Sequence, residues 1–249
     1  MRFSRYLQAI AGLLLLAGHS FADDDSARQI VDKAIRQLGD NDKVGKHQGL
    51  TSKLKGTLHL FGAPLPFRGE MNSQGPRQYR ISLSLEVDGQ STEYVSVING
   101  DNGWIKLQDN TSAMSLEQRA DARDEAYLTW VSSLVPLRDK AFQLAPMGEI
   151  EVDKKKLVGV AVTREGHRAV NLYFDKETFR LTRTETQMKD DVTYKEMTQE
   201  TTYSEYKPFD GIQHATRISI KRDGQPRADV EVELYKSSEK LDDSVFAKP

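Results

Sequence analysis

Most of this chain alternates between apolar and polar residues with a period of two. The clearest stretch places apolar side chains at Tyr79, Ile81, Leu83, Leu85 and Val87, with polar ones between them. Similar alternation returns at 50–60, 170–174, 212–220 and 230–234, and turn sequences of the Asp-Gly type separate such stretches. Because successive side chains of a strand point to opposite faces, each strand has one apolar and one polar face. Short turns between such strands predict an antiparallel sheet of about eleven strands.

Only two segments have the spacing of an amphipathic helix. Over 23–38, apolar residues recur at intervals of three and four, with Ser26 as the predicted N-cap and Gly39 as the C-terminal stop. The second predicted helix spans 115–135, where Ser115 and Gln118 match a capping box and Pro136 ends the helix.

A flat sheet of this width is unusual, because strand twist makes wide sheets curl, split or close. Two helices also cover little of an apolar sheet face. A strongly curled sheet with the helices in its hollow satisfies both constraints, and Gly56, Gly69 and Gly159 within strands are typical of bends or bulges. The predicted fold class is therefore α+β, mainly β, in one domain, since no linker or composition break divides the chain.

The first 22 residues are organised like an export signal. Arg2 and Arg5 precede an apolar stretch over 7–17, and Ser20-Phe21-Ala22 forms a cleavage site with small residues at its first and third positions. The apolar stretch is too short to cross a bilayer as a helix, which takes about 20 residues. We therefore expect cleavage between Ala22 and Asp23, which leaves one soluble periplasmic domain, 23–249.

The composition argues against several classes of function. The net charge is −2 and no basic stripe is visible, unlike a nucleic-acid-binding protein. The absence of cysteine excludes a thiol nucleophile, a thiolate metal site and a lipid-modified N-terminal cysteine. His47, His59, His167 and His214 lack metal-binding spacing, and no catalytic or phosphate-binding motif is present. The sequence thus predicts no enzyme, no cofactor and no metal.

Five short motifs follow the export signal in a fixed order. They are Gly75-Pro76-Arg77-Gln78-Tyr79-Arg80, Asn99-Gly100-Asp101-Asn102-Gly103-Trp104, Tyr173-Phe174-Asp175-Lys176-Glu177-Thr178, Tyr206-Lys207-Pro208-Phe209-Asp210-Gly211-Ile212 and Asp243-Ser244-Val245-Phe246-Ala247-Lys248-Pro249. Together they resemble the LolA-like superfamily of outer-membrane lipoprotein carriers and related periplasmic lipid-binding proteins. The resemblance spans essentially the whole mature chain. It implies an unclosed, highly curved antiparallel β-barrel with a helical lid over an apolar concave face that accepts acyl chains.

The resemblance also directs attention to a pocket. The candidate ligand-binding residues are Tyr79, Ile81, Leu83, Leu85, Trp104 and, on the lid, Trp130; Arg77 and Arg80 are candidates for the rim. Core packing of the two tryptophans and solvent exposure of the two arginines are the alternative interpretations.

One position departs from the family pattern. Classical carriers have an arginine immediately before this proline that helps to govern lipoprotein release, whereas this chain has Gly75. The leading hypothesis is a monomeric periplasmic carrier. It would take an acylated lipoprotein or another lipid from a membrane-bound donor protein and deliver it to an acceptor protein at the outer membrane. The alternative is a lipid-responsive periplasmic regulator that binds a protein partner such as an anti-sigma factor.

Overall fold

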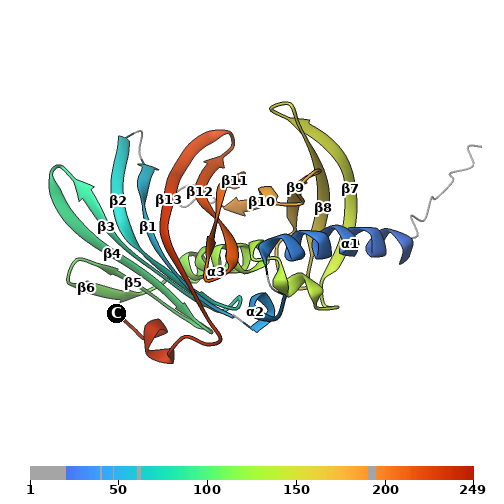
Figure 1. Cartoon of the computed structure of the whole chain (residues 1–249). Coiled ribbons are helices and arrows are strands. Elements are labelled where there is room, and N and C mark those ends of the chain that lie inside the picture. Colours follow the sequence, from blue (N-terminus) through green and yellow to red (C-terminus); the bar gives the residue numbers. More distant parts are fainter. Residues whose placement is uncertain (1–20, 40, 47, 61–62, 190–194) are drawn as a thin grey trace, which may run out of the picture.

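The computed structural model of this chain describes residues 21–39, 41–46, 48–60, 63–189 and 195–249. The predicted export signal, residues 1–22, lies outside the described residues except for its last two positions, which begin the first helix. Figure 1 shows one curved sheet that wraps around helices.

Within those residues thirteen strands form a single sheet. The strands are β1 (Gly49–Leu60), β2 (Ala63–Gln74), β3 (Gln78–Val87), β4 (Gln90–Asn99), β5 (Asn102–Leu107), β6 (Asn110–Ala113), β7 (Gln143–Val152), β8 (Lys155–Thr163), β9 (Val170–Asp175), β10 (Leu181–Lys189), β11 (Glu196–Phe209), β12 (Ile212–Arg222) and β13 (Gln225–Ser238). The helices are α1 (Phe21–Leu38), α2 (Asn41–Lys46), α3 (Leu116–Ser132) and the short 3-10 turns η1 (Val135–Arg138) and η2 (Asp243–Phe246).

Two meanders make up the sheet, and every neighbouring pair of strands is antiparallel. Strands β1–β6 form one meander and β7–β13 the other, and they join where β13 pairs with β1. Strands β6 and β7 are the two edges, so this sheet is not closed. Between them the chain crosses the hollow as α3 (Figure 1). The predicted fold class is confirmed: a mainly β, unclosed and curved antiparallel sheet with a helical lid.

Tight turns with left-handed backbone connect several strands. Asp88, Asp210 and Asp223 have φ angles of 50°, 50° and 47°, and the glycine after each also has a positive φ. Two consecutive positive φ angles are typical of a type I′ turn, whose twist matches that of a hairpin. The predicted Asp-Gly turns are therefore confirmed. Asp153 and Lys154, between β7 and β8, form a hairpin turn as well, with φ angles of 50° and 64°.

Helix α1 packs along the edge strand β7, with its apolar stripe facing the sheet. The helix begins at Phe21, so the prediction of Ser26 as its N-cap is wrong. Asp24 in the first turn accepts a hydrogen bond from Arg28 Nε at 2.8 Å and one from the Leu144 backbone N–H at 3.3 Å. The second bond joins the start of the helix to the start of β7.

Helix α3 begins as predicted. The Ser115 hydroxyl accepts from the Gln118 backbone N–H at 3.2 Å, and Gln118 Oε1 accepts from the Ser115 N–H at 2.9 Å, which completes a capping box. The helix ends at Ser132, three residues before the predicted end. Leu134 leaves the helical conformation with a φ of 68°, and Pro136 then lies in the turn η1.

The core is concentrated on one half of the sheet. Side chains of β8 and β9 pack there against α1, α3 and the segment that precedes β7. The fully buried ones are Leu134, Leu137 and Phe142 of that segment and Val160, Leu172 and Phe174 of the two strands. On the other half, Leu50, Met71, Ile81, Ile218 and Val230 are only partly buried. This difference leaves unfilled space between that half of the sheet and α3.

The C-terminal segment covers the convex face of the sheet. Arg80 lies between Tyr79 and Ile81 in β3 and so points to the face opposite theirs. Its Nη1 donates to the Val245 carbonyl at 3.3 Å, and Phe246 of η2 is fully buried against Val95 and Val97 of β4. The strand face turned away from the hollow is thus sealed here by the chain's own last residues.

Candidate functional site

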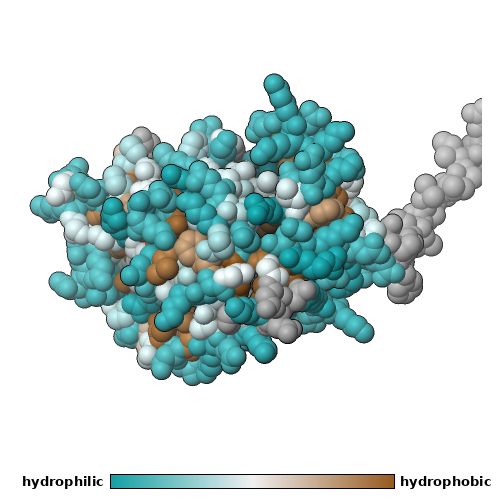
Figure 2. Space-filling model, viewed as in Figure 1, coloured by the Kyte–Doolittle hydropathy of each residue, from teal (hydrophilic) through white to brown (hydrophobic). Residues whose placement is uncertain are grey.

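A cavity of about 610 Å³ lies between the concave face of the sheet and the helices. Since a water molecule takes about 30 Å³, this space equals roughly twenty waters. Pockets for small organic ligands usually measure about 300–1,000 Å³. Figure 2 shows hydrophobic residues gathered in the middle of one face of the molecule, between mainly hydrophilic ends. The cavity is therefore large enough for a ligand with a long alkyl chain.

The sheet contributes the apolar wall of the cavity. The aliphatic side chains on this wall come from β1, β2, β12 and β13: Leu50, Leu54, Met71, Ile218, Ile220, Val230 and Val232. They point inward because they occupy alternate positions along their strands. The neighbouring positions, such as Arg217 and Glu231, face the opposite side of the sheet and carry charges. The same alternation that predicts the strands therefore provides an apolar lining.

Helix α3 forms the roof, and its two halves are held differently. In the second half Tyr127, Leu128 and Val131 are buried, whereas the first two turns are mostly exposed. The first half is held by charged groups: Arg123 Nη2 donates to Asp101 Oδ1 at 2.9 Å, and Arg119 Nη1 donates to the Asp101 carbonyl at 2.7 Å. Exposed contacts of this kind contribute little stability. The first half of the roof is therefore the part held more weakly.

On the β11 side, two polar contacts join α3 to the sheet. Tyr203 donates its hydroxyl hydrogen to Ser132 Oγ at 3.1 Å, and Arg222 Nη2 donates to Glu125 Oε1 at 3.2 Å. Burial raises the pKa of Tyr203, so this phenol stays protonated at neutral pH. These contacts define the distance between the roof and the wall at this edge.

Aromatic residues close the end of the cavity near α2. The ring of His214 stacks on Tyr235 with centroids 4.2 Å apart, and Phe209 lies edge-on to Tyr235 at 5.4 Å. Burial lowers the pKa of His214 to about 4, so its imidazole is neutral at pH 7. The Tyr235 hydroxyl donates to the Ala215 carbonyl at 2.9 Å. This end is therefore uncharged and suited to an apolar ligand.

Three of the six predicted ligand-binding residues line this cavity: Tyr79, Ile81 and Trp130. Leu83 and Leu85 belong to the apolar cluster on the same sheet half but are not among the lining residues. Trp104 packs with Val95, Val97 and Phe246, under the C-terminal segment. Contact of Tyr79, Ile81 and Trp130 with a ligand stays a prediction.

The two predicted rim arginines have different positions. Arg77 follows Gly75 and Pro76, which line the cavity, and its Nη2 donates to Asp101 Oδ1 at 3.0 Å. Since Asp101 also binds Arg123 of α3, Arg77 lies beside the roof contacts. Arg80 instead holds the C-terminal segment on the convex face. Gly75 adopts a φ of 62° in the β2–β3 turn, a conformation that an arginine adopts only with strain.

The β11 side of the cavity is not evident from the sequence. Gln199, Thr201 and Tyr203 occupy alternate positions of β11 and all line the cavity. They are polar or amphipathic, so an apolar period of two does not identify them. What the sequence does show is that this threonine-rich stretch has no apolar face, which is unusual for a central strand of a sheet.

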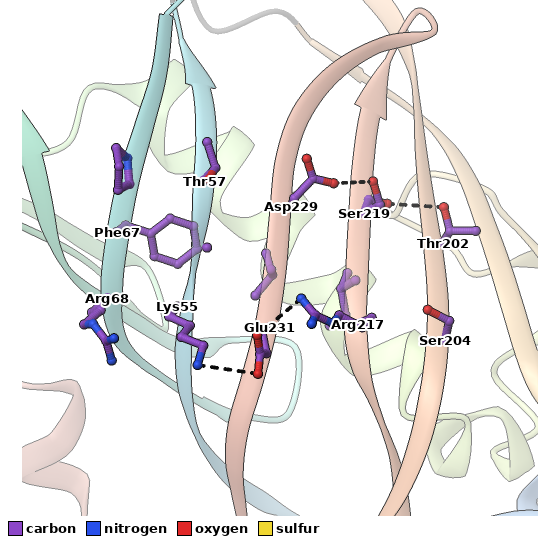
Figure 3. Close-up of a pocket in the computed structure, with 14 residues that line it drawn as sticks. Lys55, Thr57, Phe67, Arg68, Thr202, Ser204, Arg217, Ser219, Asp229 and Glu231 are labelled. Atoms are coloured by element: carbon purple, nitrogen blue, oxygen red, sulfur yellow. Dashed lines mark hydrogen bonds and ion pairs between the residues drawn. The ribbon is translucent and has the colours of Figure 1, made fainter.

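A second groove crosses the convex face of the sheet, and its character is different (Figure 3). Lys55 Nζ lies 3.5 Å from Glu231 Oε1, Arg217 Nη1 lies 3.2 Å from Glu231 Oε2, and Ser219 donates to Asp229 at 2.7 Å. These charges already pair across neighbouring strands. The groove therefore offers no apolar surface comparable to that of the cavity, and we take the cavity as the candidate site.

The described residues contain no group of three or more histidine, cysteine, aspartate or glutamate side chains placed to hold a metal ion. No helix in the part of the chain that the structure describes is both long and apolar enough to cross a membrane.

Comparison with known proteins identifies the fold. No family model and no curated protein sequence matches this chain. Among solved structures, a DUF1329 family protein from Desulfovibrio piger aligns with a TM-score of 0.57 at 14% identity, over 89% of this chain and 97% of that one. A LolA superfamily protein from Nitrosomonas europaea aligns with a TM-score of 0.55 at 14% identity, over the same shares of the two chains.

A further solved structure, described as an outer membrane lipoprotein-sorting protein domain from Vibrio parahaemolyticus, aligns with a TM-score of 0.53 at 11% identity. The alignment covers 88% of this chain and 97% of that one. At such low identities the likeness establishes the fold alone. With its unclosed antiparallel sheet and its helical roof over an apolar hollow, this chain has the LolA-like fold.

Proposed function

We propose that this chain is a periplasmic carrier that binds the acyl chains of a lipoprotein or another lipid and moves them toward the outer membrane. In this proposal residues 1–22 direct export, and 23–249 form a single lipid-binding domain. The proposal includes no chemical conversion of the cargo. The observation that supports it best is the cavity of about 610 Å³ with an aliphatic wall under a weakly held roof.

The energetics of such a carrier follow from apolar burial. Each methylene group that leaves water contributes about 0.8 kcal/mol. An acyl chain in this cavity therefore gains about as much per methylene as it does in a bilayer, and exchange between the two environments needs no chemical energy. Release requires access to the chain, and movement of the first half of α3 away from Asp101 would provide it. LolA-like solved structures that include a lipoprotein-sorting domain agree with this role.

Two adjacent residues of β11 provide a matched test. Thr201 is buried and lines the cavity, whereas Thr202 is exposed on the opposite face of the same strand. We expect Thr201→Trp to obstruct part of the cavity and sharply reduce co-purification of acylated cargo in native mass spectrometry, while Thr202→Trp retains it. Circular dichroism would check that both variants are folded.

The result that would contradict the proposal is wild-type protein that never retains a lipid or acylated molecule. Retention of cargo by Thr201→Trp as well would place the ligand elsewhere. A bound polypeptide together with an empty cavity would favour the regulator hypothesis instead.

A further inference from the structure

The cavity wall has hydrogen-bonding groups that the protein itself does not satisfy. Gln199 of β11 lies on the cavity wall and is only 1% exposed. Its Oε1 accepts from Arg222 Nε at 2.9 Å, which fixes the orientation of the amide. Its Nε2 has no hydrogen-bond partner among the described residues. A buried amide donor without a partner is unfavourable, so this position is suited to an acceptor supplied by a ligand.

Tyr79 of β3 is a further donor on the cavity wall. Burial and, next, the nearby Glu125 carboxylate raise the pKa of this phenol, so the hydroxyl keeps its proton. No hydrogen bond joins this hydroxyl to a described residue. Glu125 in turn accepts from Arg222, the same guanidinium that binds Gln199. Arg222 thus fixes Gln199 beside Glu125, at a part of the wall that we call the donor end.

Other polar groups on the cavity wall either lie away from the donor end or already form hydrogen bonds within the protein. Tyr206 donates its hydroxyl hydrogen to the Leu181 carbonyl at 2.7 Å, and Tyr235 donates to that of Ala215. His214 Nε2 is also without a described partner. However, His214 pairs with Lys207 of β11, which lies about 26 Å of extended strand away from Gln199. A single ligand group therefore reaches the donor end or His214, not both.

We propose that the donor end binds the carbonyl oxygen of an acyl ester or amide, so that this site selects acylated molecules by their acyl linkage as well as by their hydrocarbon chain. This inference rests on the proposed function. Gln199 Nε2 donates to the carbonyl, and the chain extends under α3 along Leu54 and Val232.

A pair of ligands that differ in one carbonyl tests this proposal. A 1-monoacylglycerol and the 1-alkylglycerol ether of the same chain length compete for the purified protein with the fluorescent apolar probe N-phenyl-1-naphthylamine. We expect the acyl form to compete about tenfold better, as one buried hydrogen bond to the carbonyl predicts. Gln199→Met should reduce this ratio to about two. Tyr206→Phe, whose hydroxyl already bonds to the backbone, should keep the ratio at about ten.

The two proposals fail in different ways. Equal competition by both ligands in the wild-type protein would overturn the donor end and leave lipid binding intact. A ratio that stays near ten in Gln199→Met would also overturn it. Competition by neither ligand would overturn the proposed function, and this inference with it.

Discussion

On the β8–β9 half of the sheet, α1 and α3 lie directly on the strands, and side chains such as Leu172 and Phe174 are fully buried. From β12 through β13 to β3 the strands alternate in the same way, but the helices cover their apolar residues only in part, and a cavity remains. The two halves differ in how they are covered. In this fold, binding capacity thus comes from incomplete covering of a sheet rather than from a dedicated sequence motif.

Truncation of one leucine in each half gives the largest expected contrast. Leu172→Ala removes a fully buried side chain and should lower the free energy of unfolding by about 4 kcal/mol. Leu50→Ala changes a partly buried side chain that already borders the cavity, and we expect a loss of about 1 kcal/mol. Equilibrium urea denaturation measures both values. Similar losses would mean that the two halves are equally well packed.

Acid should act on the unfilled half through His214. Burial lowers the pKa of this imidazole from 6.5 to about 4, so the unfolded chain binds the proton more readily than the folded one. The stability due to neutral His214 is complete above pH 6.5, decreases as the pH falls toward 4, and amounts to about 3 kcal/mol in total.

The variant His214→Phe retains an aromatic ring beside Tyr235 and cannot titrate. Its free energy of unfolding should therefore fall less than that of the wild type between pH 6.5 and 4. Denaturation series at several pH values compare the two proteins. Parallel curves would show that His214 does not account for the acid sensitivity.

Close approach of strands β2 and β3 should make Gly69 intolerant of a side chain. A Cβ at this position would overlap the Ser82 carbonyl oxygen and lie 2.7 Å from Leu83 Cδ2. We expect Gly69→Ala to cost about 2 kcal/mol. Gly45→Ala in α2, where a Cβ meets nothing within 4 Å, is the control and should be neutral or slightly stabilising. Thermal unfolding distinguishes them, and an unchanged melting temperature for Gly69→Ala would contradict so close an approach of these strands.

The smallest effect on stability should come from Asp101, which binds Arg77 and Arg123 near the start of the roof. This carboxylate is exposed, so Asp101→Ala should cost less than about 1 kcal/mol. We expect ligand release to become severalfold faster, because the first half of α3 loses a contact. Stopped-flow release of a fluorescent lipid measures this rate. Glu93→Ala removes an exposed ion pair with Lys106 and should leave the rate unchanged.

The local features of this fold are largely predictable from the sequence. Asp-Gly pairs determine the hairpin turns, and the capping box at Ser115 determines the start of α3. Ser26 is wrong as a cap because its position alone does not distinguish a cap from an interior residue. Features that depend on contacts between distant parts of the chain are harder to predict from the sequence. Trp104 pairs with Val97 in the sheet, so its side chain lies on the same sheet face as the side chain of Arg80. Only the position of the C-terminal segment reveals that this face is covered.

The cavity itself could be expected in outline, but only part of its lining could. Tyr79 and Ile81 follow from strand alternation together with a curved sheet. Gln199 and Thr201 could not be found this way, since their inward faces are polar and no hydrophobic period marks them. Their importance depends on which part of α3 lies opposite them, and that is decided by the route of the chain between β6 and β7.

Strands β6 and β7 end the sheet without pairing with each other. In a closed barrel the number of strands and their stagger fix the internal diameter, so a ligand must fit that diameter. An open sheet can widen or narrow by small changes in the twist between neighbouring strands, and every ladder of backbone hydrogen bonds survives the change. We therefore expect this molecule to bind ligands of different widths. The adjustment would be shared among a dozen junctions between neighbouring strands rather than confined to one hinge.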